Sequence, residues 1–181
     1  MPILKVMLDT NAFDEIYVRG LKETLSNATS SGKVQFYITQ IQANEISKVV
    51  DEVKRSYILS VIESVPVVKL LTSGGRFGTA RPTRVGFTGS SWSGFSFGGT
   101  NDAAPLNRFQ RQHRRNPMGN SADLLIANTA VQQKCDYLVS SNAEDFKNVI
   151  AALNTEYSGN VQLIDIARLL VLLGVWPKQR K

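Results

Sequence analysis

The stretch Ile3–Asn11 reads ILKVMLDTN, a short and nearly continuous apolar run that stops at Asp9. A run of this kind, without regular polar alternation, is typical of a strand in a parallel sheet that helices cover on both faces. Four later runs have the same character: Val34–Ile38, Val67–Leu71, Tyr137–Ser140 and Val161–Ile164. The chain therefore contains several candidate strands for one buried parallel sheet.

Helical periodicity separates these runs. Apolar residues recur at helical spacing in four segments: Gln40–Ser64, Asn120–Lys134, Ala143–Glu156 and Asp165–Leu173. In the first segment the apolar stripe consists of Ile46, Val49, Val50, Val53 and Tyr57. Strands that alternate with helices imply parallel pairing through right-handed crossovers. We predict one three-layer α/β/α domain over residues 1–181, with a central parallel sheet of about five strands.

The segment from Gly74 to Asn120 interrupts this alternation. It holds nine of the thirteen glycines, six Phe or Trp residues, seven arginines and a single acid, so it carries the whole net charge of +6. Arginine with interleaved aromatic residues suits RNA, because guanidinium groups bind phosphates and rings stack on bases. We expect residues 74–119 to be an insert in the domain that binds substrate through four arginines: Arg108, Arg111, Arg114 and Arg115. A solvated loop, or a docking surface for an acidic protein inhibitor, would have the same composition.

Composition excludes several other classes. The apolar fraction of 43% and the charged fraction of 20% are ordinary for a globular protein. Polar residues interrupt the longest apolar stretches, which fall short of the roughly 18–20 residues that a membrane span needs. Met1–Leu8 has no small-residue cleavage site after it and does not resemble a signal peptide. Cys135 is the single cysteine, which excludes an internal disulfide framework and fits a reducing compartment. We expect a cytoplasmic protein with no membrane partner.

Four acids are expected to meet at one edge of the sheet, since ligands of open parallel sheets bind beyond the carboxyl ends of the strands. Asp9 ends the first strand, and Glu45 lies near the start of the helix after the second. Asp123 lies in the first turn of the helix after the insert. Asp145 opens the helix after the fourth strand, with Asn142 beside it.

Four converging carboxylates would repel one another and raise one another's pKa values. A hard divalent cation removes this conflict, and oxygen ligands favour Mg²⁺ or Mn²⁺. Such an ion can orient a phosphodiester and activate a water molecule. The alternative is helix capping, because Asn120-x-x-Asp123 and Asn142-x-x-Asp145 also read as helix starts. A non-catalytic RNA-binding module with capping acids is thus the rival interpretation.

Four runs resemble, in the same order, the motifs of PIN (PilT N-terminus) domain ribonucleases, which include the toxins of VapC-type toxin–antitoxin pairs. The runs are VMLDTN (Val6–Asn11), ITQIQANEI (Ile38–Ile46), NSADLLIANTA (Asn120–Ala130) and LVSSNAEDF (Leu138–Phe146). The resemblance implies a parallel sheet, a Mg²⁺ or Mn²⁺ site and endonuclease activity on single-stranded or loop RNA. Homodimers are common among similar domains, and a toxin would have a protein antitoxin as partner.

Residue by residue, the resemblance maps metal ligation and catalysis onto Asp9, Glu45, Asp123 and the Asn142/Asp145 position. It places Thr10 and Asn11 in the same pocket as substrate-binding residues. Where many members have an acid soon after the fourth strand, this chain has Asn142, and its acid follows only at Asp145.

Overall fold

The computed structural model describes residues 2–65, 67–70 and 121–175. Their five strands are β1 (Leu4–Leu8), β2 (Val34–Thr39), β3 (Val67–Leu70), β4 (Tyr137–Val139) and β5 (Gln162–Ile164). All neighbouring pairs are parallel, and the strand order is β3-β2-β1-β4-β5. The predicted fold class, α/β with a parallel sheet of five strands, is confirmed.

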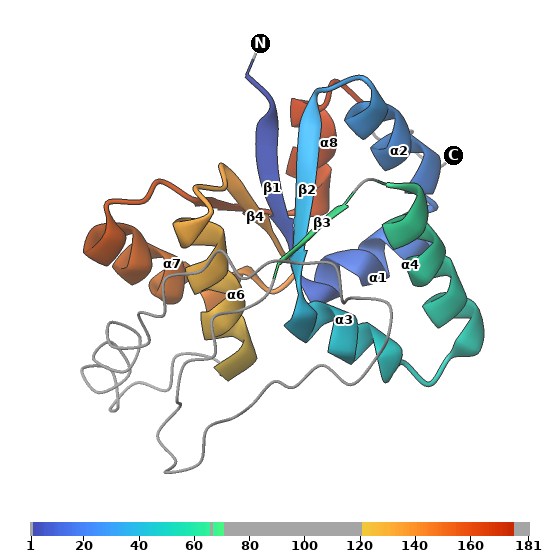
Figure 1. Cartoon of the computed structure of the whole chain (residues 1–181), viewed down its shortest axis with the longest axis horizontal. Coiled ribbons are helices and arrows are strands. Elements are labelled where there is room, and N and C mark those ends of the chain that lie inside the picture. Colours follow the sequence, from blue (N-terminus) through green and yellow to red (C-terminus); the bar gives the residue numbers. More distant parts are fainter. Residues whose placement is uncertain (1, 66, 71–120, 176–181) are drawn as a thin grey trace.

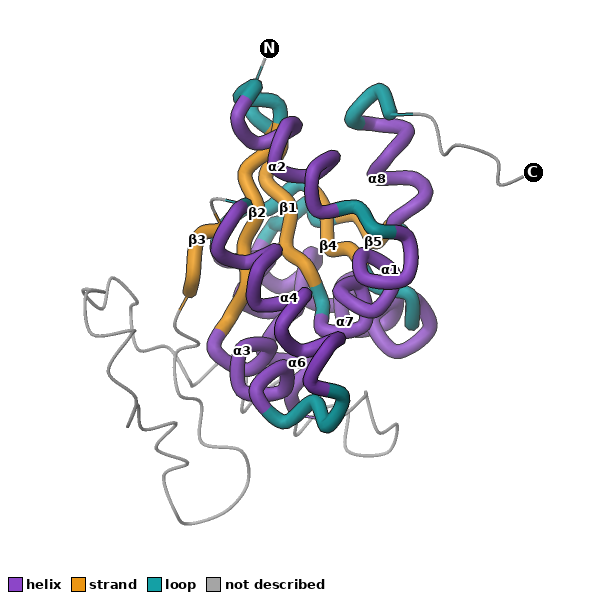
Figure 2. The backbone as a smooth tube through the Cα atoms, turned by 90° about the vertical axis from the view of Figure 1, so that its right-hand side faces the viewer, coloured by secondary structure: helices purple, strands orange, loops and turns teal. Residues whose placement is uncertain are grey.

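Seven helices are formed by the described residues. They are α1 (Thr10–Arg19), α2 (Lys22–Ser30), α3 (Gln40–Ser47), α4 (Glu52–Ser64), α6 (Ser121–Gln132), α7 (Ala143–Tyr157) and α8 (Ile166–Leu172). Helices α6 and α7 lie on one side of the sheet, and α1, α2, α4 and α8 lie on the other (Figure 1). Figure 2 looks onto the face that α1, α2, α4 and α8 cover. None of the described helices has the length and apolar character needed to cross a membrane.

The alternation of side chains along β1 produces two separate cores. Val6 and Leu8 belong to one hydrophobic cluster, which includes Phe13 and Ile16 of α1. Met7 points to the opposite face and belongs to a second cluster, which is built largely from α6 and α7. All three β1 residues are completely or almost completely buried. Burial on both faces explains why the strand is apolar at successive positions.

The predicted helix over Gln40–Ser64 is wrong as a single element. Helix α3 ends at Ser47, and α4 begins after Asp51, whose side chain accepts a hydrogen bond from the Lys54 backbone at 3.0 Å. An aspartate at the N-cap satisfies an amide that the helix leaves unpaired, so it begins a new helix. The predicted apolar stripe is wrong at Val50, which is 92% exposed, and at Val53, which is 71% exposed. Ile46 is buried and Tyr57 packs against the same core, as predicted. The buried residues of α4 come later: Ile58, Val61 and Ile62.

The structure also contains two helices, α1 and α2, that were not predicted. Helix α1 begins directly after Asp9 and ends at Gly20, which has a φ of +63°. Glycine adopts this left-handed conformation without a steric penalty, and it commonly ends helices. The crossover from β1 to β2 therefore contains two short helices that meet near Gly20.

The strand order reverses between β1 and β4. The chain adds β2 and β3 on one side of β1, and then β4 and β5 on the other. Leu8 at the end of β1 is in register with Val139 at the end of β4. In open parallel sheets, the crevice beyond the strand ends at such a reversal is the usual ligand site. The residues that follow Leu8 and Val139 are therefore the first candidates for function.

Candidate functional site

Asp9 lies at the reversal point and is held by both β4 and α1. Its backbone N–H donates to the Val139 carbonyl at 2.9 Å, which continues the pairing of β1 with β4. One carboxylate oxygen, Oδ1, accepts from the Thr10 N–H at 2.7 Å. The other, Oδ2, accepts from the Ser140 hydroxyl at 2.8 Å. Asp9 is only 3% exposed, so these contacts fix the orientation of a buried carboxylate.

The surroundings of Asp9 disfavour its charged form. Burial raises the pKa of Asp9, and the nearby charge of Glu45 acts in the same direction, while hydrogen bonds from Ser140, Thr10 and Asn11 oppose the shift. In the described part of the chain, the side-chain ion pairs join Arg19 to Glu15, Lys54 to Asp14, and Arg55 to Glu52. None of them reaches Asp9 or Glu45. A buried carboxylate beside a second carboxylate is stabilised by binding a proton or a cation.

Glu45 reaches this site from α3, the helix that follows β2. It is half-buried, and its Oε2 accepts a short hydrogen bond from the Thr10 hydroxyl. Thr10 is the first residue of α1 and donates through its backbone to Asp9 and through its side chain to Glu45. The structure therefore brings together three of the residues predicted for the site: Asp9, Thr10 and Glu45.

Ser140 was not predicted as a site residue. It follows β4, is almost completely buried, and connects Asp9 to the start of α7, because its Oγ also accepts from the Asn142 N–H at 3.0 Å. The sequence placed Ser140 as the last residue of the predicted strand Tyr137–Ser140, and hydroxyls at strand ends are too common to be diagnostic. Only the strand order shows that Ser140 lies beside Asp9.

Asn142 occupies the N-cap position of α7, and its side chain makes no capping hydrogen bond there. The structure thus contradicts side-chain capping at Asn142, the role that the rival interpretation gave to this residue. The predicted cap at Asn120 lies outside the described residues. Asp145 is within α7, but its side chain is not among those described.

Asp123 lies in the first turn of α6 and is half-buried. Ile126, Ala127 and Ala130, which share its helical face, are all buried. Asn11, in the first turn of α1, is exposed, although its N–H contributes to the environment of Asp9. Within the described ranges, no three Asp, Glu, His or Cys side chains are grouped so that they could hold a metal ion. Asp9 and Glu45 are brought together, but Asp123 does not form with them a group of three that could hold a metal ion. The four-carboxylate cluster stays a prediction.

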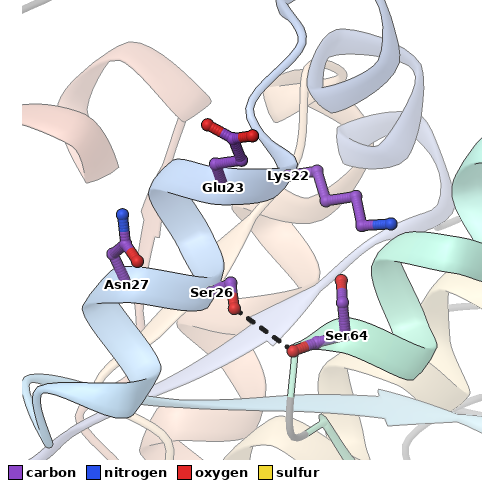
Figure 3. A pocket seen from close by; sticks show the side chains of 5 residues that line it. All are labelled: Lys22, Glu23, Ser26, Asn27 and Ser64. Atoms are coloured by element: carbon purple, nitrogen blue, oxygen red, sulfur yellow. Dashed lines mark hydrogen bonds between the residues drawn. The ribbon is translucent and has the colours of Figure 1, made fainter.

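The predicted substrate-binding arginines and the insert over 74–119 lie outside the described residues. Elsewhere, a shallow pocket separates α2 from the end of α4, lined by Lys22, Glu23, Ser26, Asn27 and Ser64. The Ser26 hydroxyl donates to the Ser64 carbonyl at 3.3 Å across it (Figure 3). Ser64 lies shortly before β3 begins, so this pocket is near the amino ends of the strands, at the opposite edge of the sheet from Asp9.

Comparisons of the chain with protein-family models, with curated proteins and with solved structures give no match. The likeness to PIN domains therefore rests on the four motifs alone. The structure shows an α/β fold with a five-stranded parallel sheet.

Proposed function

We propose that this protein is a metal-dependent nuclease that cleaves RNA, with Asp9 and Glu45 as metal-binding carboxylates. The observation that carries the proposal is the Asp9 carboxylate itself. It is buried at the reversal of the strand order, adjacent to Glu45, and held by Ser140 and Thr10. A structural aspartate at a helix start has no need of a second carboxylate beside it, and the repulsion between the two destabilises the fold.

The donor set fits a hard cation. The side-chain groups gathered at this point are carboxylate and hydroxyl oxygens, from Asp9, Glu45, Thr10 and Ser140. Mg²⁺ and Mn²⁺ prefer such oxygen ligands, whereas soft metals prefer sulfur. We propose Asp123 and Asp145, with Asn142, as the residues that complete the site. When bound, the ion would neutralise the carboxylates, lower the pKa of a water molecule and polarise a phosphodiester.

The remaining residues have positioning roles in this proposal. The Ser140 hydroxyl and the Thr10 N–H each occupy one oxygen of Asp9, so the carboxylate cannot rotate. The Thr10 hydroxyl holds Glu45 in the same way. Hydrogen bonds of this kind fix the orientation of metal ligands, and their loss typically weakens metal binding or activity about 10–100-fold.

RNA is proposed as the substrate on two grounds from the sequence. The insert over 74–119 combines seven arginines with aromatic residues, and the four motifs resemble those of PIN ribonucleases. On the same grounds we propose a VapC-like toxin role, with a protein antitoxin and a homodimer as partners. The rival is a non-catalytic RNA-binding module, and it has one observation in its favour: Asp9 accepts a hydrogen bond at the start of α1.

Cleavage assays separate the two functions. The purified protein should cleave single-stranded RNA when Mn²⁺ is added and should lose this activity with a chelator. Asp9→Asn should abolish cleavage. Asp14→Asn is the matched control, since Asp14 lies on α1, which begins directly after Asp9, but is exposed and paired with Lys54. RNA binding without cleavage, unchanged by either substitution, would establish the non-catalytic module instead.

A further inference from the structure

Gln42 is a buried amide on the same helix as Glu45. It lies three residues before Glu45 in α3 and is 0% exposed. A buried amide is stable only when its donors and its acceptor are paired, so its partners show what it connects. Those partners belong to two different strands.

On one side, Gln42 closes the start of α3. Its Oε1 accepts from the Thr39 N–H at 2.5 Å, and the Thr39 hydroxyl accepts from the Ile41 N–H at 3.2 Å. The Thr39 side chain also accepts from the backbone N–H of Gln42, so Thr39 and Gln42 form a reciprocal capping box, which here fixes the first turn of α3 onto the end of β2.

On the other side, Gln42 reaches β1. Its Nε2 donates to the Leu8 carbonyl at 2.5 Å. Leu8 is the last residue of β1, and the pairing of β1 with β2 ends one residue earlier, at Met7 and Tyr37. The Leu8 carbonyl lies beyond that pairing, and a buried carbonyl without a partner is costly. The amide of Gln42 thus takes the place of the next N–H in the β1–β2 ladder.

These contacts place Gln42 between the two candidate ligands. The Leu8 carbonyl belongs to the peptide bond that leads into Asp9, and Glu45 is one turn further along α3. Asp9 is held from the β4 side by Val139 and Ser140, whereas on the β2 side Gln42 holds the carbonyl before it. Thr10 bridges the two acids directly, and Gln42 adds a second link, from α3 to the backbone that leads into Asp9. The spacing of Asp9 and Glu45 therefore depends in part on the Gln42 side chain, which is outside the proposed ligand set.

We propose that Gln42 is a positioning residue that sets the separation of Asp9 and Glu45 for metal binding. The inference rests on the proposed function and extends it to a residue outside the ligand set. Gln42 and Glu45 move together because they share one helical turn. If the contact with Leu8 is removed, α3 can shift relative to β1. The separation of the Asp9 and Glu45 carboxylates then changes, and they bind one ion less well.

The test compares two Gln42 variants with a matched control. Gln42→Met keeps the length and fills the buried space but makes none of the hydrogen bonds of the amide to Thr39 and Leu8. Gln42→Asn keeps the amide but is one methylene too short to reach both partners. The control is Gln40→Met, on the same helix, because Gln40 is also buried, at 6% exposed, and makes no hydrogen bond through its side chain within the described part of the chain. Both the Mn²⁺ dissociation constant, by calorimetry, and the Mn²⁺ dependence of RNA cleavage are measured below each variant's unfolding temperature.

Both Gln42 variants should weaken Mn²⁺ binding about tenfold or more, and Gln40→Met should leave it unchanged. A purely structural role would lower the unfolding temperature without changing the affinity of the folded protein for Mn²⁺. Equal Mn²⁺ affinity in Gln42→Met, Gln42→Asn and Gln40→Met would overturn the proposal. Asp9→Asn separates this result from a failure of the proposed function. If the unmodified protein binds Mn²⁺ no better than Asp9→Asn, there is no metal site, and both proposals are wrong.

Discussion

The Ser140 hydroxyl donates to Oδ2 of Asp9 at 2.8 Å, although the two residues are 131 positions apart in the chain. The contact joins the ends of β4 and β1 where the strand order reverses. It also lowers the pKa of Asp9, against the larger effect of burial, which raises it. The pKa of Asp9 thus depends first on its burial and, in the opposite direction, on a hydroxyl that the strand order brings beside it.

Asp9→Asn should stabilise the metal-free protein at neutral pH. Burial raises the pKa of Asp9 above its ordinary value of 3.8, so between the two values the folded state binds more protons than the unfolded state. Stability contributed by this group therefore falls as pH rises through that window, and ionised Asp9 is destabilising above it. The gain in stability from Asp9→Asn should shrink below about pH 4, where Asp9 is protonated in both the folded and the unfolded state. Thermal unfolding in the presence of a chelator, at several pH values, measures the difference in stability between Asp9→Asn and the unmodified protein.

Adding Mn²⁺ should reverse the order of the two proteins. A ligand at 100 times its dissociation constant stabilises the folded state by about 2.7 kcal/mol, which is a shift of several degrees in a chain of this size. The unmodified protein should gain this shift and Asp9→Asn should not. If, in the absence of metal, Asp9→Asn unfolds at a lower temperature than the unmodified protein, then Asp9 serves chiefly as the cap of α1.

Ser140→Ala should destabilise the fold by about 1–3 kcal/mol, because the buried Asp9 carboxylate loses one of its hydrogen-bond donors and the Asn142 N–H loses an acceptor. Loss of this hydrogen bond should also raise the pKa of Asp9 further, so the acid limb of the pH profile for cleavage should move to higher pH. Ser141→Ala is the control, since Ser141 is the exposed neighbour. Lower stability with an unshifted pH profile would limit Ser140 to a structural role.

Replacing Arg108, Arg111, Arg114 and Arg115 with alanine should flatten the salt dependence of RNA binding. Each phosphate contact that is lost should remove about 0.7 from the slope of log K against log salt on a single strand. Lysine at the same four positions keeps the charge and should keep the slope. Cleavage at saturating RNA should survive in both variants. An unchanged slope in the alanine variant would favour the docking surface for an acidic protein inhibitor.

Cys135 should resist alkylation in the folded protein. The residue is buried, and burial raises the pKa of its thiol to about 12. The thiolate is the reactive form, so at pH 8 a maleimide reagent should label native protein far more slowly than protein in denaturant. Mass spectrometry after timed quenching measures both rates. Rapid labelling of the native protein would mean that β4 and the end of α6 open more readily than their packing indicates.

Local pattern was sufficient for the fold class and for most elements. Every predicted strand is present within one or two residues of its expected bounds, because each coincides with a short, mainly apolar run in the sequence. The prediction of one helix over Gln40–Ser64 failed because its apolar spacing was given more weight than the helix-capping residue within it. The run of valines before Ile58 suggested a continuous helix, but the Asp51 cap begins a new one and leaves Val50 and Val53 in solvent. Helix α1 was not predicted, although its three buried residues, Ala12, Phe13 and Ile16, lie at helical spacing.

The sequence by itself determined that acids follow the first and second strands, and that Asp9 terminates an apolar run. Only the tertiary structure decided which residues surround Asp9. Ser140 comes from the far end of the chain, and Gln42 meets Leu8 through a carbonyl that carries no side-chain signal. Strand order and the exact end of a ladder are set by packing of both sheet faces at once. Hydrogen bonds that depend on them are therefore invisible in local pattern, which records only the burial and the conformation of each segment.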